Sequence, residues 1–402
     1  MRTKIRAAAK RLWTRDFAVT TLSNLLLFYS FQLLIPTIPL YAAQLGGGQA
    51  QIGLLMGLFT LASLLTRPLA GKALDVLGRK HVLTAGLALC GIAVFGYSLA
   101  AVLTLLLVLR FIHGIGWGIS TTSLGTVISD IVPSDRRGEG MGIYGLSNTM
   151  AMALAPLTGL WIASTYGFHA LFVSSTLLAF AAMLISFLIN QKPRRAQKKP
   201  VAFTWRSMSS GLLEPGALLP SLLLFFTATC YGGVVTFLTL FGEEAGISNV
   251  GWFFVVNAVM LLVTRPLTGL IFDRKGPSWV LIPGALFTGG GLWLLSYADS
   301  ALSLASAAAV FGAGFGSVQP ALLAWTIERT PPSRRGAANG TFYSANDLGI
   351  GTGSMLLGIL ATRTGGYGAA YRWSVVLIVV LLAIYACYLI RAKRKAARIK
   401  PA

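Results

Sequence analysis

Stretches of mostly apolar residues alternate with short polar connections along the chain. A helix needs roughly 20 such residues to cross a bilayer, and twelve stretches reach about this length. We expect helices near residues 16–41, 51–71, 81–100, 101–128, 140–163, 168–190, 217–242, 250–272, 279–298, 300–327, 337–362 and 369–390. Prolines within several stretches predict kinks. The pattern therefore predicts an all-α membrane protein with twelve transmembrane helices.

Charged residues are too few for a soluble domain, and their positions suit a membrane protein. Of the 402 residues, 55% are hydrophobic and 11% are charged, whereas soluble domains have about 25% charged residues. A net charge of +21 would suggest nucleic-acid binding in a soluble protein. Here most Lys and Arg fall in connections on one side, and the opposite loops carry only Arg363 and Arg372. This positive-inside asymmetry predicts a multi-pass protein of the cell membrane, with both termini cytoplasmic and no nucleic acid as partner.

The residues that enzymes and metal sites use are scattered. Cys90, Cys230 and Cys387 lie in apolar stretches at spacings that suit neither a metal site nor a disulfide framework. The sequence offers no nucleophile with a neighbouring base and no nucleotide-binding glycine loop. We therefore expect no enzyme activity, no bound metal and no cofactor, and a membrane enzyme or a channel is a remote alternative.

The two halves of the chain repeat one pattern in register. Thr66-Arg67-Pro68-Leu69 returns as Thr264-Arg265-Pro266-Leu267, and Asp75 is matched by Asp273 at the same offset of 198 positions. Six helices bring the chain back to its starting side, so two such halves form parallel repeats, as in transporters whose site lies between the repeats. We expect one bundle at 1–190, a cytoplasmic linker at 191–213 and a second bundle at 214–402.

Three motifs resemble signatures of the major facilitator superfamily. Gly71-Lys-Ala-Leu-Asp75-Val-Leu-Gly78-Arg79-Lys80 is similar to the loop after the second helix of that family, and Arg110-Phe-Ile-His-Gly114 resembles the arginine signature of its proton-coupled members. Ala155-Pro156-Leu-Thr-Gly159 is similar to the helix 5 signature of the twelve-helix drug:proton antiporters, with Ala155 in place of the usual glycine. The resemblance spans nearly the whole chain. It implies the major facilitator fold, in which twelve helices form two pseudo-symmetric six-helix bundles.

The first motif is a candidate conformational latch. Gly71 and Gly78 suit a short turn. The resemblance implies that Asp75 faces the positive N-terminal end of the eleventh helix and that Arg79 pairs with an acid such as Asp130. Together with their counterparts, the predicted latch residues are Gly71, Asp75, Gly78, Arg79, Asp130, Asp273 and Glu328. The alternative is a solvated turn that merely obeys the positive-inside rule.

Arg110 is expected near mid-bilayer, roughly 14 Å from the outer end of its helix at 1.5 Å per residue. A charge at that depth costs about 2.5–3.5 kcal/mol unless it faces a cavity or a partner, which favours a functional arginine over a structural one. His113 and Trp117 follow at i+3 and i+7 and share its face. An arginine in such a place suits the carboxylate of an anionic or zwitterionic substrate.

Asp347 is the leading candidate for the proton site, because it alone among the twelve acids lies deep within an apolar stretch. The alternative is a carboxylate that bonds a neighbouring helix backbone. Arg110 and His113 complete the predicted proton-coupling group, and a hydrogen-bonded packing role is the alternative for His113. Glu243 and Glu244 are expected to form a solvated outer rim, and the alternative is that they gate proton entry. The remaining polar side chains of apolar helices bond one another or meet the substrate. The predicted cavity residues are Asn24, Tyr29, Gln32, Arg110, His113, Trp117, Asn148, Tyr231, Asn257, Gln319 and Asn346.

These features favour a proton-coupled exporter of a small organic molecule, such as a drug or a metal-chelating metabolite. We expect alternating access driven by the proton gradient, with the substrate, protons and the lipid bilayer as partners and a monomer as the working state. The alternative is a proton-coupled importer or a uniport facilitator on the same fold, because only the helix 5 signature at Pro156 and Gly159 favours export.

Overall fold

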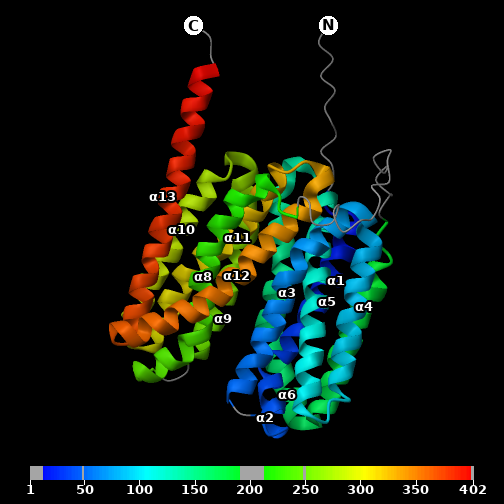
Figure 1. Cartoon of the computed structure of the whole chain (residues 1–402). Helices are drawn as coiled ribbons and strands as arrows, with labels where there is room; N and C mark the ends of the chain where they lie inside the picture. The colour runs from blue at the N-terminus through cyan, green and yellow to red at the C-terminus, as the bar shows by residue number, and fades with distance from the viewer. Residues whose placement is uncertain (1–11, 48, 191–211, 248–249, 400–402) are drawn as a thin grey trace. The chain divides into compact units, whose positions relative to one another are not determined.

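The computed structural model describes residues 12–47, 49–190, 212–247 and 250–399, and these ranges fold into helices and short connections. The helices are α1 (Arg15–Leu34), α2 (Thr37–Gln44), α3 (Gln49–Leu77), α4 (Arg79–Tyr97), α5 (Leu103–Ile131), η1 (Ser134–Arg136), α6 (Arg137–Ser186), α8 (Pro215–Glu244), α9 (Gly251–Lys275), α10 (Ser278–Leu295), α11 (Ala301–Glu328), η2 (Pro332–Arg334), α12 (Arg335–Thr364) and α13 (Tyr367–Ile399). Figure 1 labels most of them. The predicted linker at 191–213 lies outside the described residues except for its last two positions.

The predicted twelve crossings agree with the helices. In the described part of the chain, ten helices are long and apolar enough to span a membrane. One of them, the run that contains α6, holds two crossings, because Gly167 breaks the helical backbone with φ of 82° and ψ of 172°. Only glycine adopts such a backbone without strain. The polar helix α12, which carries Asn346 and Asp347, is not among the ten and supplies the remaining crossing.

The first predicted crossing differs from the structure in one respect. The sequence predicts one helix over 16–41, but the structure divides it into α1 and α2 at Pro36. Proline lacks the backbone N–H that would continue the ladder of helical hydrogen bonds, and its ring clashes with the preceding turn. The two pieces still form one apolar span from Arg15 to Gln44.

The contacts of the chain define two compact units. The first extends to Leu212 and also takes in Pro331–Ala337, while the second consists of Leu213–Thr330 and the residues from Ala338 onward. In the first unit α1 packs along α6, and α3 and α4 pack against α5. In the second unit α9 and α10 pack along α11, and α13 lies against α8 and α10. The start of α12 therefore packs with the first unit, although the rest of that helix belongs to the second.

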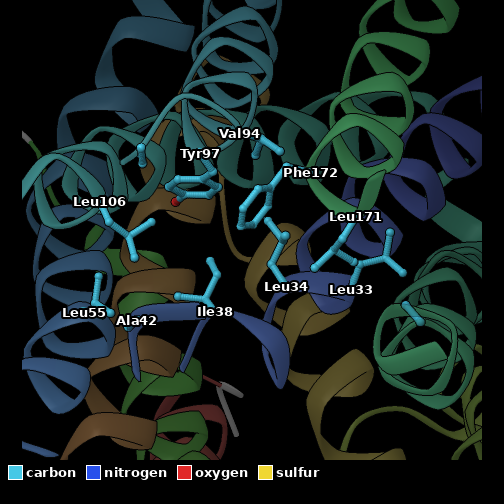
Figure 2. Packing of buried hydrophobic residues seen from close by; sticks show 12 residues of the cluster. Leu33, Leu34, Ile38, Ala42, Leu55, Val94, Tyr97, Leu106, Leu171 and Phe172 are labelled. Atoms are coloured by element: carbon cyan, nitrogen blue, oxygen red, sulfur yellow. The ribbon is translucent and has the colours of Figure 1, made fainter. Parts of the chain in front are cut away.

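A cluster of buried apolar side chains fixes the helices of the first unit at one end. It includes Leu34, Ile38, Leu55, Leu106 and Phe172, which come from five different helices. Figure 2 shows the Tyr97 ring between the Leu106 and Phe172 side chains, with 5.7 Å between the centroids of the Tyr97 and Phe172 rings. This packing holds α4 in place and so positions the Tyr97 hydroxyl.

Glycines allow close contact between helices in both units. A Cβ atom on Gly159 of α6 would overlap the Leu33 carbonyl of α1, and one on Gly353 of α12 would overlap the Thr229 carbonyl of α8. Small residues of this kind drive helix packing in membranes, where lipid supplies no hydrophobic force between helices. Gly159 of the helix 5 signature therefore has a packing role.

Candidate functional site

Arg110 lies on α5 and is fully buried, with 0% of the residue exposed. Its guanidinium carbon is 4.4 Å from the centroid of the Phe59 ring on α3 and 5.6 Å from that of the Phe31 ring on α1. Both distances fall within the range of a cation–π interaction. Two aromatic faces therefore surround the positive charge.

Hydrogen-bond acceptors for Arg110 are scarce. Its Nη2 donates to the Met56 sulfur at 3.5 Å, and a thioether is only a weak acceptor. Within the described residues, neither Nε nor Nη1 of Arg110 has a hydrogen-bond partner. A buried donor without an acceptor costs about 1–3 kcal/mol, and more when the group is charged. The guanidinium is thus stabilised by aromatic faces and by the nearby Tyr97 hydroxyl, while Nε and Nη1 have no hydrogen-bond partner among the described residues.

His113 and Trp117 share the α5 face of Arg110, as predicted. The Tyr97 hydroxyl lies 3.0 Å from Nδ1 of His113, and His113 meets the Phe59 ring edge-on at 5.3 Å. The Trp117 ring stacks on Phe31 with 4.1 Å between centroids. Arg110, His113 and Trp117 therefore form one cluster with Phe31, Phe59, Met56 and Tyr97, which we call the Arg110 cluster.

Asp75 lies in the last turn of α3 and not in a loop, yet it makes the contacts that the sequence predicts. Asp75 accepts hydrogen bonds from the backbone N–H groups of Gly336 and Ala337, both at 3.0 Å, and these groups begin α12. Nη1 of Arg79 lies 3.0 Å from Oδ1 of Asp75, and Nε of Arg79 lies 3.2 Å from Oδ2 of Asp130. A carboxylate at a helix N-terminus is favoured by the helix dipole.

Gly71 and Gly78 have different roles, and only Gly78 lies in the predicted turn, because α3 continues to Leu77. A Cβ atom on Gly71 would be 2.5 Å from the Gly336 carbonyl oxygen, so only glycine allows the two backbones to come so close. Gly78 precedes α4 with φ of 94°, a backbone conformation that favours glycine. Gly71 is thus required by a close backbone contact, and Gly78 by its own backbone conformation.

Arg335, the first residue of α12, extends this network and was not predicted. Its Nη1 donates to Asp130 at 2.8 Å and to the Ser129 carbonyl at 2.7 Å. Asp130 thereby accepts from Arg79 through one carboxylate oxygen and from Arg335 through the other. The duplicated Arg-Arg-Gly at 136–138 and 334–336 was the available signal.

The predicted acids of the second unit lie on four helices. Asp273 is in the last turn of α9, Glu328 ends α11, and Asp347 is half-buried along α12. Glu244, which the sequence assigned to a solvated rim, accepts a hydrogen bond from the Tyr367 N–H at 2.9 Å. It therefore caps the start of α13.

Several predicted cavity residues bond neighbouring helices of the first unit. Asn24 of α1 donates to Ser147 at 2.7 Å and to Asn148, and accepts from the Tyr144 hydroxyl at 2.7 Å. Tyr29 of α1 is 3.0 Å from the Thr158 hydroxyl of α6. These side chains hold α1 to α6. Gln32 lies half-buried on α1.

Two buried arginines occupy matching positions in the two units. Arg67 donates to Thr121 at 2.7 Å, and Arg265 donates to Gln319 at 3.0 Å. Each donor lies 54 positions before its partner, so the two pairs are related by the repeat. Nε2 of Gln319 also donates to Oδ1 of Asn346 at 3.5 Å.

Tyr231 and Asn257, both predicted for the cavity, lie against α11. Tyr231 stacks on Phe315 with 4.4 Å between ring centroids. Asn257 adjoins Gly312, and its Oδ1 has no hydrogen-bond partner within the described residues.

Comparisons with known proteins agree with this architecture. The sequence model described as the Major Facilitator Superfamily matches residues 20–253 and 245–402. Multidrug resistance protein MdtG of Escherichia coli is 26% identical over 397 residues, covering 95% of this chain and 96% of that protein. An uncharacterized MFS-type transporter of Methanocaldococcus jannaschii is 23% identical over 373 residues, covering 90% and 94%.

Solved structures share the fold at lower identity. The human organic anion transporter MFSD10 has a TM-score of 0.80 at 18% identity, covering 92% of this chain and 100% of that chain. A bacterial homologue of the iron transporter ferroportin has a TM-score of 0.78 at 14% identity, covering 93% and 99%. At these identities the likeness concerns the fold.

Proposed function

Because this chain belongs to the major facilitator superfamily and is a secondary transporter rather than an enzyme, we propose that it exports a small organic molecule in exchange for protons. The direction is supported by the similarity to MdtG, which is named for multidrug resistance and matches nearly the full length of this chain. The helix 5 residues Pro156 and Gly159 agree with it.

The observation that carries the proposal is the buried guanidinium of Arg110. A charge within a membrane-spanning helix marks a substrate or ion pathway unless it is neutralised. In the Arg110 cluster the charge is held by aromatic faces and has unused donors. We assign Arg110 and Trp117 to substrate binding. The half-buried Asp347 of α12 is assigned to proton binding, with His113 as the second candidate.

The contacts of Asp75 and Asp130 support the latch. They tie the first residues of α12 to α3 and α5 through hydrogen bonds in which at least one partner is charged, and such bonds are worth about 1.5–3 kcal/mol each. In our proposal they form in one state of the alternating-access cycle and break in the other. Asp273 and Glu328 are assigned the corresponding role in the second half.

Import or exchange of an anion is the second candidate function, and the unused donors of Arg110 favour it. A substrate anion and a proton attract each other, so they bind together more readily than they compete. Joint binding leads to movement of both in the same direction, which a proton gradient would drive inward. The two candidate functions thus differ in whether substrate and protons move in opposite directions or in the same direction.

Reconstitution into liposomes tests both. If the chain is an exporter, an imposed inward proton gradient should drive uphill movement of a drug against the proton flow. Movement of the substrate in the same direction as the protons would refute export and indicate symport. Flux that does not respond to the gradient would leave only a uniport facilitator.

We further propose that both termini are cytoplasmic and that the monomer is the working unit. The chain is a multi-pass membrane protein, and the positive-inside asymmetry supports the orientation. In a cysteine-free background, Gly365→Cys between α12 and α13 should react with an impermeant thiol reagent added to intact cells, whereas a cysteine at position 207 should not. Labelling in the opposite pattern would reverse the orientation.

A further inference from the structure

We propose that Arg110 binds the anionic group of an aromatic organic anion, which enters by displacing the Phe31 and Met56 side chains. The inference rests on the proposed transport function, but not on its direction. It assigns the substrate a chemical class, an aromatic body that bears one carboxylate or a similar anion.

The first argument is the unmet demand of the guanidinium. Its five N–H donors form a planar fork that matches a carboxylate. Here a weak sulfur acceptor is the hydrogen-bond partner of Nη2, and within the described residues Nε and Nη1 have none. An incoming carboxylate would supply two strong acceptors and a compensating charge together.

The second argument is that the first unit offers no acid at this depth. Its acids all lie at or beyond helix ends, namely Asp16, Asp75, Asp130, Asp135 and Glu139. Most of them already have partners there. Asp75 and Asp130 bind Arg79, Glu139 binds Arg136, and Asp16 accepts from the Asn190 N–H.

The third argument concerns the shape and chemistry of the cluster. Among the neighbours of Arg110, Tyr97 and His113 are buried at 0% and 1% exposure and bonded to each other. Phe31 and Met56 are half-buried, and Met has a flexible side chain that repacks readily. A ligand would therefore reach Arg110 by displacing Phe31 and Met56, the more exposed of these neighbours.

The aromatic rings define the rest of the ligand. Phe31 stacks on Trp117 at 4.1 Å and on Phe59 at 4.9 Å. If Phe31 turns away, the faces of Trp117 and Phe59 become available to another flat ring, since offset stacking is the preferred geometry. A carboxylate on that ring would then lie over Arg110. Position 308, the counterpart of Arg110 in the second half, is alanine, so the repeat does not duplicate this arginine.

Equilibrium binding to the full-length protein in lipid nanodiscs tests the proposal. The probes are radiolabelled 2-naphthoate, its neutral amide 2-naphthamide and the cation 2-naphthylmethylamine, which share one aromatic body. We expect the wild-type protein to bind the carboxylate at least about tenfold more tightly than either analogue. Arg110→Gln should abolish that preference, and Arg110→Lys should keep part of it because the charge remains but the fork is lost.

Arg67→Gln is the matched control. It removes a second buried arginine of the same unit, one that already donates to Thr121, and should leave the preference for naphthoate intact. Equal affinity of the wild-type protein for the three probes, or binding of none, would overturn the proposal even if the Arg110 variants do not fold. So would an undiminished naphthoate preference in Arg110→Gln.

Flux measurements keep this inference apart from the transport proposal. Gradient-driven flux of a cationic drug without any preference for naphthoate would refute the anion site and leave the exporter. An Arg110-dependent naphthoate preference in a protein that moves no solute across liposomes would support the anion site and refute the transport role.

Discussion

Arg335 and Asp130 form an ion pair of 2.8 Å that joins the first residue of α12 to the last turn of α5. The two residues are 205 positions apart. Asp130 is 22% exposed at its side chain, so solvent screens part of the attraction, but Arg335 is largely buried. The pair therefore contributes more than a surface salt bridge while it remains accessible enough to break.

Asp130→Asn should slow transport about tenfold or less while substrate affinity stays unchanged, because it weakens the bonds to both Arg79 and Arg335. Initial rates in proteoliposomes and equilibrium binding give the two quantities. Asp135→Asn, in the exposed turn that follows α5, is the control and should behave as the wild type. Equal slowing in both variants would argue for a general effect of surface charge.

Asp75→Asn should have a similar effect on rate, since an amide oxygen replaces a charged acceptor at the N-terminus of α12, where the helix dipole favours negative charge by about 0.3–1 kcal/mol. Asp273→Asn should do less, because the second loop has Pro277 where the first has Arg79. Loss of substrate binding in both variants would indicate a substrate role instead of a latch.

Asp347→Asn should eliminate uphill transport driven by a pH gradient and leave counterflow intact, since the amide cannot take up and release a proton. Arg110→Ala should impair both activities, because Arg110 is assigned to the substrate. If Asp347→Asn retains full gradient-driven transport, the proton binds elsewhere, and His113 becomes the leading candidate.

Tyr97→Phe should lower stability by about 1–3 kcal/mol, because it leaves Nδ1 of His113 buried without a partner. The midpoint of thermal unfolding in detergent measures this loss. Tyr29→Phe, which removes a half-buried hydroxyl beside Thr158, should cost less. If His113 takes part in proton transfer, Tyr97→Phe should also shift the pH profile of transport, and an unchanged profile would restrict the pair to packing.

Gly353→Ala should destabilise the second unit by about 1–3 kcal/mol, because the new methyl group overlaps the Thr229 carbonyl. Gly351→Ala is a matched control two residues away, where a Cβ atom meets nothing within 4 Å. It should be neutral or stabilising by up to about 1 kcal/mol, since alanine favours helix over glycine. Equal thermal midpoints for the two variants would contradict the close α8–α12 packing.

Apolar periodicity and the repeat predicted the fold well, because each bilayer crossing leaves a long and distinctive stretch. The contacts of Asp75 and Arg79 also followed from the family motif. The residues that surround Arg110 could not be predicted from the sequence in this way. Phe31, Phe59 and Met56 resemble any lipid-facing apolar residue in the sequence, and only their position beside a charge distinguishes them.

Polar residues in apolar helices were harder to assign for a related reason. The sequence predicts Asn24 and Asn148 for the cavity, yet they bond each other and help to hold α1 to α6. A single sequence shows that such a side chain needs a partner but not whether another helix or a ligand supplies it. The sequence likewise shows the proline at position 36, but it does not show whether that proline kinks one helix or separates two helices.

The matched arginines suggest how such a protein can be re-engineered. Arg67 and Arg265 occur at matching positions of the two halves, each with a partner at the matching position, whereas the position that corresponds to Arg110 is Ala308. The two arginines that occur twice bond neighbouring helices, and the arginine that occurs once has donors available for a ligand. A designer who wishes to change what this carrier accepts should therefore vary the unpaired positions and leave the duplicated ones alone.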